Sequence, residues 1–213
     1  MKVISTNIAK PTTIIWNGKE VATGIYKTPT SSPIYLGKEN VKGDEVSDRN
    51  VHAGEYKACY LFSLNQYKYW ENLYPNLEWN HGMFGENLTV KDLDETKLNV
   101  GDIYKIGTAT VQITQPREPC FKFGVKFGSQ NALKQFINHG FPGAYVRVLE
   151  EGEVENNDVF ELVKQAKNSL TIADLFNLLF AKDKNQELLN LAINNDALPV
   201  KKRNKLKAYL KNG

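Results

Sequence analysis

The stretch from Thr114 to Phe123 holds the residues whose types and spacing are best suited to chemistry. It reads Thr-Gln-Pro-Arg-Glu-Pro-Cys-Phe-Lys-Phe and contains Cys120, one of two cysteines in the chain. Pro116 and Pro119 fix their own φ angles and keep the preceding residues out of the helical region. The pattern therefore predicts a stiff, extended loop that holds the Cys120 thiol in place.

Charged neighbours bear on the reactivity of this thiol. Arg117 precedes Cys120 and Lys122 follows it, and a nearby cation favours the nucleophilic, metal-binding thiolate over the thiol. Glu118 opposes this effect if its side chain points the same way. The competing interpretation is an inert, buried cysteine, because free cysteines are among the most buried residues.

Composition describes an ordinary globular protein. The chain has 213 residues, of which 41% are hydrophobic and 24% charged, enough for one large core or one domain with a small appendage. No apolar run is long enough to span a bilayer, and the first residues lack a signal-peptide core. Two cysteines far apart make no disulfide framework, so we expect a cytoplasmic protein.

A basic segment, residues 201–211, carries much of the positive charge. The net charge is only +3, but this segment contains Lys201, Lys202, Arg203, Lys205, Lys207 and Lys211. Such a run usually forms a solvated helix face. Nucleic-acid binding is not expected, because Tyr209 is the one aromatic residue available for stacking on bases.

Short β-branched runs fill most of the chain before residue 165. Residues 3–8, 12–16, 19–27, 34–36, 110–114, 144–149 and 158–163 are expected strands, with a hairpin turn at Asn17-Gly18. Ser63 is expected to cap a helix running to about Tyr74, and Ser129 one running through Asn138. Many short strands with few helices predict a closed or nearly closed β-barrel, an α+β fold that is mainly β.

The character of the chain changes after about residue 164. Thr171 and Asp174 form a capping box before a first helix, Asp183 can begin a second, and Pro199 stands at the start of a third. We expect a barrel domain over residues 1–164 and a three-helix domain over 165–213. Three short helices are marginal alone, so they should dock on the barrel or pair with a second chain as a homodimer.

Several short motifs in this order resemble one family. They are Thr23-Gly24-Ile25-Tyr26-Lys27-Thr28-Pro29, Gly43-Asp44, His52-Ala53-Gly54, Lys57-Ala58, Phe84-Gly85-Glu86-Asn87-Leu88, Val100-Gly101-Asp102 and Gln115-Pro116-Arg117-Glu118-Pro119-Cys120. The sequence resembles the MOSC domain, named for the C-terminal domain of molybdenum cofactor sulfurase. Within it, the chain is most similar to bacterial 6-N-hydroxylaminopurine resistance proteins of the YiiM type, whose helical tail it shares.

The resemblance implies a β-barrel that binds molybdenum cofactor (molybdopterin) in a cleft lined by loops. Cys120 is implied as the molybdenum ligand and catalytic residue, or as a carrier of sulfur. A thiolate suits this soft metal. Pyridoxal phosphate binding is also implied at the level of the family. His52 is a candidate proton donor, but Ala53 stands where the family commonly has glycine, which weakens that role.

Other residues are expected to hold the cofactor. Its phosphate needs cations, for which Arg117, Lys27 and Lys57 are candidates. The pterin edges need donors and acceptors, which Asn87, Glu86 and the Gly85 loop can supply. Phe84 is expected either to flank a planar ligand or to pack in the core, Asn87 either to bind or to satisfy a turn, Cys59 to be core, and Asp44 to pair with Arg49.

The expected activity is reduction of N-hydroxylated compounds such as N-hydroxylaminopurines. No Gly-x-Gly-x-x-Gly motif follows an expected strand, so electrons should come from a separate flavodoxin-like or ferredoxin-like protein or a flavoprotein reductase. The basic segment is a candidate docking surface for such an acidic donor. The alternative is a non-catalytic carrier of molybdenum cofactor, or of persulfide sulfur on Cys120.

Overall fold

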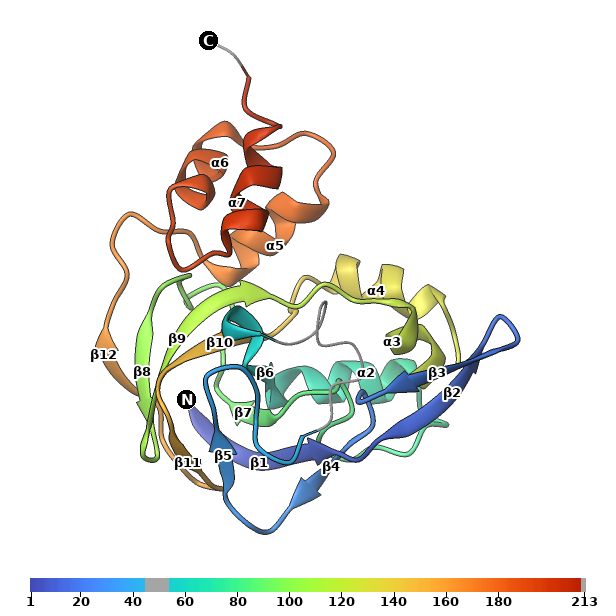
Figure 1. Ribbon diagram of the computed structural model, residues 1–213. Coiled ribbons are helices and arrows are strands. Elements are labelled where there is room, and N and C mark those ends of the chain that lie inside the picture. The colour runs from blue at the N-terminus through green and yellow to red at the C-terminus, as the bar shows by residue number, and fades with distance from the viewer. Residues whose placement is uncertain (45–53, 212–213) are drawn as a thin grey trace.

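A curved eight-stranded sheet forms the centre of the molecule (Figure 1). The computed structural model describes residues 1–44 and 54–211. The hydrogen-bonded order of the main sheet is β12-β8-β9-β10-β6-β7-β1-β4. Its strands are β1 (Lys2–Ala9), β4 (Lys27–Thr30), β6 (Cys59–Ser63), β7 (Leu88–Lys91), β8 (Ile103–Ile106), β9 (Ala109–Pro116), β10 (Ala144–Glu150) and β12 (Glu161–Lys164).

The main sheet is mixed, and its strand order is open. All its described pairs are antiparallel except β6 with β7, which run parallel. β12 and β4 lie at the two edges, although an isolated bridge from Lys2 to Val159 joins β1 to the segment before β12. The mainly β, α+β class is therefore confirmed, whereas closure into a barrel is not.

Two small antiparallel sheets accompany the main one. β5 (Ile34–Leu36) pairs with β11 (Gly152–Val154), and β2 (Thr12–Trp16) pairs with β3 (Lys19–Thr23). Asn17 and Gly18 both have positive φ, 50° and 73°, as the predicted tight hairpin turn requires. The return strand is shorter than predicted, because Lys27 belongs to β4 and pairs with β1.

Helices lie between the strands and after the last one, and their boundaries partly differ from the predicted ones. They are η1 (Glu55–Lys57), η2 (Leu64–Gln66), α2 (Tyr67–Leu73), α3 (Phe121–Lys126), α4 (Asn131–His139), α5 (Ile172–Phe180), α6 (Gln186–Ile193) and α7 (Val200–Lys207). Ser63 occupies the N-cap position of η2, as predicted, but its hydroxyl makes no capping hydrogen bond, because it is buried and donates to the Leu93 carbonyl. Asn185, not Asp183, caps α6.

The three C-terminal helices dock on the sheet. The predicted capping box is present, since the Thr171 hydroxyl accepts from the Asp174 amide at 3.0 Å and the Asp174 carboxylate accepts in return. The Ile172 amide donates to the Leu98 carbonyl at 2.8 Å. Leu175, Leu189 and Leu206 belong to the same aliphatic core as the sheet. The tail therefore gains the burial that short helices cannot provide alone.

A second, aromatic core lies beside the aliphatic one. Phe62 of β6 stacks on Phe84 with ring centroids 3.9 Å apart, and Trp70 of α2 meets Phe84 and Phe123 edge-on. All four side chains are fully buried. Such rings bury large areas and pack with defined geometry, so this core fixes α2, α3 and the loop before β7 relative to one another.

Candidate functional site

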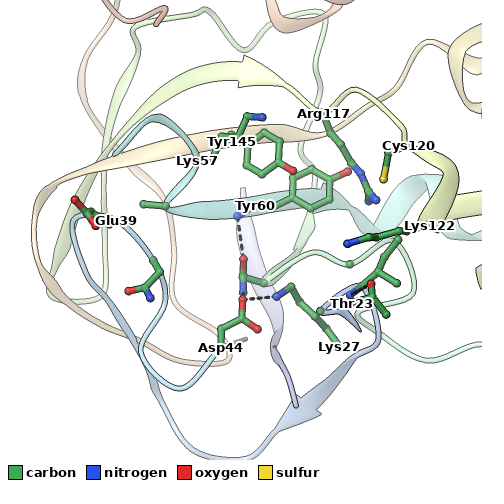
Figure 2. A pocket seen from close by; sticks show the side chains of 16 residues that line it. Thr23, Lys27, Glu39, Asp44, Lys57, Tyr60, Arg117, Cys120, Lys122 and Tyr145 are labelled. Carbon is green, nitrogen blue, oxygen red and sulfur yellow. Dashed lines mark hydrogen bonds and ion pairs between the residues drawn. The ribbon is translucent and has the colours of Figure 1, made fainter. Parts of the chain in front are cut away.

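Cys120 lies on the wall of a cavity, here called the Cys120 cavity (Figure 2). β9 ends at Pro116, and Cys120 is the residue before α3, with the extended backbone angles φ −125° and ψ 171°. Its side chain is half-buried, whereas Cys59 in β6 is fully buried, as the sequence predicts. Burial raises the pKa of Cys59. Of the two cysteines, only Cys120 lines the cavity.

The cations near Cys120 form what we call the thiol wall, made of Arg117, Cys120 and Lys122. The Arg117 guanidinium donates to the Phe84 carbonyl and lies 5.2 Å from the centroid of the Tyr60 ring. The Lys122 ammonium donates to the Ala22 carbonyl of β3 at 3.0 Å. Both cations line the cavity with the thiol. The predicted grouping of cations with Cys120 is therefore present.

Arg117 is held as a cation in the protein interior. Its side chain is buried beside Tyr60, Tyr145 and Cys120. Burial acts to lower the pKa of Arg117, but the tyrosines and the thiol outweigh burial, so this pKa is raised. A fixed positive charge stabilises an anion nearby, whether a thiolate or a bound phosphate.

The opposite side of the cavity, here called the floor, consists of Lys27, Asp44 and Asn87. Asp44 accepts from the Lys27 ammonium, from the Asn87 side-chain amide at 2.9 Å and from the Ala9 backbone amide at 2.7 Å. All three floor residues are less than a tenth exposed. Figure 2 shows the dashed contacts of this network. Burial lowers the pKa of Lys27, and Asp44 opposes that shift.

The floor residues are already engaged with the protein. The Asn87 side-chain oxygen accepts from the Tyr60 amide at 3.2 Å, while its nitrogen donates to Asp44. Asn87 thus joins β6 to the loop before β7, in addition to lining the cavity. Asp44 forms an ion pair with Lys27 of β4. Its predicted partner, Arg49, lies outside the described residues.

The loop before β7 is shaped by Glu86. This buried carboxylate accepts from the Gly82 amide at 2.9 Å, the Phe84 amide at 3.0 Å, the Thr89 hydroxyl at 2.7 Å and the Tyr67 hydroxyl. Gly82 has φ 86°, and a Cβ there would lie 2.6 Å from the Lys27 carbonyl oxygen. Only glycine fits that approach, which brings the loop against β4.

Two predicted ligand residues are placed away from the cavity surface. Glu86 and Phe84 are both fully buried and absent from the cavity lining, whereas Gly85 between them does line it. Phe84 packs in the aromatic core, the second of its two expected roles. Glu86 is occupied by four donors of its own loop and neighbours. Glu86 thus positions the loop in this structure, and its predicted contact with a cofactor stays a prediction.

Lys57 and Tyr145 complete the cavity beside the thiol wall. The Lys57 ammonium lies 5.6 Å from the centroid of the Tyr145 ring, and both residues line the cavity. Burial lowers the pKa of Lys57, as does the neighbouring Lys202, while Glu118 and Cys120 raise it. Burial raises the pKa of Tyr145. His52, the predicted proton donor, lies outside the described residues.

Several lining residues were missed from the sequence. Tyr60 and Tyr145 are cross-strand partners on β6 and β10, with ring centroids 5.0 Å apart. The alternation of β10 indicates that Tyr145 lies on the face opposite to Ala144 and Val146, but the sequence does not show that its cross-strand partner is Tyr60. Thr23 also lines the cavity, as does Lys122, which the sequence had already placed beside Cys120. The free volume is about 80 Å³ with the side chains in these positions.

Comparison with known families identifies the scaffold. The family model of the MOSC domain matches residues 48–161, more than half of the chain. The chain belongs to the MOSC domain family. The match contains Arg117, Cys120 and Lys122, together with Asn87 and Lys57, so the whole thiol wall and part of the floor are MOSC residues. Lys27 and Asp44 precede the match.

Individual relatives narrow this membership to one type of MOSC protein. YflK of Bacillus subtilis (strain 168) is 36% identical over 170 residues, covering 80% of this chain and 76% of YflK. The crystal structure of YiiM from Geobacillus stearothermophilus superimposes with a TM-score of 0.82 and 32% identity, covering 98% of both chains. The chain is thus a MOSC protein of the YiiM type.

A longer fungal protein contains a region similar to this chain. A protein named Reductase from Gibberella moniliformis (strain M3125 / FGSC 7600) is 29% identical over 175 residues. The match covers 81% of this chain but 31% of the fungal protein.

No described helix of the MOSC chain has the length and apolar character that crossing a membrane requires.

Proposed function

We propose that this MOSC protein is a molybdenum-cofactor-dependent reductase of N-hydroxylated compounds such as N-hydroxylaminopurines. The observation that carries the proposal is a half-buried thiol on the wall of a cavity that also presents Arg117, Lys122, Lys57 and Lys27. A soft sulfur ligand beside several cations suits a soft metal carried on a phosphorylated organic group. Membership of the MOSC family supports the same chemistry.

The donor set fits the cofactor, with one condition on space. Cys120 would supply the protein ligand to molybdenum, and Arg117 with Lys57 would hold the phosphate. The free volume of about 80 Å³ is below the several hundred Å³ typical of organic ligand sites. Cofactor binding therefore requires the cavity to widen, and the half-exposed Cys120 side chain can move with less loss of hydrogen bonding than the floor residues.

The reaction converts N–OH to N–H and water, which consumes two electrons and two protons. When bound, the cofactor supplies the two electrons and the centre that accepts the oxygen. The chain positions the substrate against Cys120, excludes water through Tyr60 and Tyr145, and provides positive charge from Arg117. His52 is the proposed proton source, because histidine as a residue type has an ordinary pKa near neutral pH.

Electrons are proposed to come from a separate redox protein. The sequence has no dinucleotide-binding motif after a strand, so an acidic flavodoxin-like or ferredoxin-like protein or a flavoprotein reductase would act as donor. The fungal protein named Reductase, in which the matched region is about a third of the whole, supports a redox setting for this domain. We also propose that two copies of the chain form a homodimer.

The test combines metal content with turnover. Protein purified gently without oxygen should contain molybdenum by elemental analysis and should reduce 6-N-hydroxylaminopurine with a chemical reductant. Molybdenum without any turnover would replace the reductase by a non-catalytic cofactor carrier. Labile sulfur on Cys120 without molybdenum would point to a sulfur carrier, and absence of all three would refute the proposal.

A further inference from the structure

A second concave region adjoins the Cys120 cavity, between the sheet and the three C-terminal helices. This region, here called the lysine groove, has a free volume of about 600 Å³. Lys57 lines both the groove and the cavity, so the two spaces meet at that side chain. Glu118, which also lines the groove, lies two residues before Cys120. A ligand reacting at Cys120 would therefore enter the groove by passing the Lys57 side chain.

The groove is strongly positive. Five lysines and two glutamates line it, and the lysines come from η1, the segment before α6, and α7: Lys57, Lys184, Lys201, Lys202 and Lys205. Lys184 is committed to the end of α5, where it donates to the Leu178 carbonyl at 2.7 Å and the Leu179 carbonyl at 2.9 Å. Of the others, Lys201 and Lys205 are exposed on α7, where an anion can approach them.

One glutamate does not neutralise this charge. Glu118 pairs with Lys202 at 2.6 Å. Burial acts to raise the pKa of Glu118, but Lys202, together with Lys57 and Lys205, outweighs burial, so its pKa is lowered. Three cations around one carboxylate repel each other, and Lys202 is one of the causes that lower the pKa of Lys57. A dianion such as phosphate would relieve that repulsion.

The shape of the groove favours a small anion over a protein surface. The Lys202 side chain is only 15% exposed, so a flat or convex partner would not reach it, whereas a phosphate group entering the groove would. Lys201 and Lys205 are exposed at its rim. Tyr209, Leu206 and Pro199 add apolar surface on the same lining, which suits the sugar or base of a nucleotide.

We propose that the lysine groove binds the phosphate of a nucleotide substrate, so that the protein acts on phosphorylated N-hydroxylated nucleosides in preference to free bases. The inference rests on the proposed function for the reacting N–OH group, which would lie at Cys120. The phosphate would lie beyond Lys57, among Lys202 and Lys205. The free space at Cys120 is too small for a whole nucleotide, and the groove supplies the rest.

Binding measurements test the phosphate site without any turnover. Isothermal titration of the full chain with adenosine 5′-monophosphate should give a dissociation constant at least about tenfold below that with adenosine, the effect of one charge-assisted hydrogen bond. Lys205→Glu should remove most of this preference. Lys207→Glu is the matched control, because Lys207 is also exposed on α7 but does not line the groove.

Turnover then separates substrate from other anions. N-hydroxyadenosine 5′-monophosphate should show a lower KM than N-hydroxyadenosine, and Lys205→Glu should raise only the KM of the phosphorylated substrate. Equal binding of both adenosine compounds, or equal losses from Lys205→Glu and Lys207→Glu, would overturn the proposal. So would a Lys205→Glu variant that loses only molybdenum content, or only affinity for the electron donor.

The two proposals fail in different ways. If adenosine 5′-monophosphate binds through Lys205 but no N-hydroxylated compound is reduced, the phosphate site stands and the reductase does not. If free N-hydroxylaminopurine is reduced as well as its nucleotide, the reductase stands and the phosphate site falls.

Discussion

The two sides of the Cys120 cavity, the floor and the thiol wall, differ in what they expose to a ligand. On the floor, the charged or polar groups of Lys27, Asp44 and Asn87 are buried and bonded to one another or to the backbone. On the thiol wall, Arg117 and Lys122 are likewise buried and bonded to backbone carbonyls, whereas Cys120 is half-exposed and its thiol is presented to the cavity. The comparison shows that the polar groups of both sides are committed to the fold and that the thiol is left for a ligand.

Substitution of Cys120 should have the largest effect on function. Cys120→Ser should lower the rate of N-hydroxylaminopurine reduction by about a thousandfold or more, because a hydroxyl is a poor ligand for a soft metal. The free energy of unfolding should change by no more than about 0.5 kcal/mol, since the site is half-exposed. Initial rates and urea denaturation measure the two quantities.

Cys59 provides the matched control for this substitution. Cys59→Ser places a hydroxyl in a fully buried position and should destabilise the fold while leaving the rate of the folded enzyme unchanged. Full activity in Cys120→Ser would remove the thiol wall from the mechanism.

Loss of the floor carboxylate should have the largest effect on stability. Asp44→Asn leaves the Lys27 ammonium buried without its counter-charge, which should reduce the free energy of unfolding by about 3–5 kcal/mol. Urea denaturation at neutral pH measures the loss. Asp196→Asn is the control, because that carboxylate pairs with Arg203 at 2.7 Å while 90% exposed, and its loss should cost under about 1 kcal/mol.

Glu95 is a buried carboxylate with few hydrogen-bond partners, and its protonation should make stability depend on pH. It accepts from the Gly143 amide at 3.0 Å, one of its oxygens has no hydrogen-bond partner among the described residues, and burial raises its pKa to about 7. The folded state then holds the proton more tightly than the unfolded state. The contribution of Glu95 to the free energy of unfolding should be greatest below pH 4.5 and should fall as the pH rises to about 7.

Replacing Glu95 tests that pH dependence. Glu95→Gln should raise the free energy of unfolding at pH 8 by roughly 2–3 kcal/mol and flatten its slope between pH 5 and 7 by up to ~1.4 kcal/mol per pH unit. Urea denaturation across pH measures both. An unchanged slope would show that Glu95 finds a partner in solution that restores its ordinary pKa.

Glu86 should give a smaller effect of opposite sign. Glu86→Gln turns one acceptor oxygen into a donor that faces either the Phe84 amide or the donors on the other oxygen, so stability should fall by about 2 kcal/mol. Molybdenum content per folded protein should stay the same, because Glu86 does not line the cavity. Loss of molybdenum at full stability would instead make Glu86 a ligand-binding residue.

Features with local causes were predictable from the sequence. The Asn17-Gly18 turn needs positive φ at two adjacent residues, and the capping box at Thr171 needs only residues three apart. Cys120 has an extended backbone, as predicted for the loop that contains Pro116 and Pro119. α3 was missed because it is short, contains Gly124 and has no side-chain cap, so nothing local announces it.

The composition of the cavity was predictable only in part. Family motifs pointed to Arg117, Lys57 and Asn87, all of which line it. The pairing of Asp44 with Lys27, and of Tyr60 with Tyr145, depends on strand order and register, which one sequence does not reveal. The same motifs placed Glu86 and Phe84 among the ligands because they adjoin Gly85, although the loop turns their side chains inward.

The parallel pair of β6 and β7 has a consequence for how the protein is assembled. Parallel neighbours cannot be joined by a tight turn, and here α2 and the loop carrying Gly85 and Asn87 lie between them in the chain. Closing that long crossover comes late in folding because entropy is lost before contacts form. A newly synthesised chain should therefore acquire its fold class first and its ligand-binding capacity last.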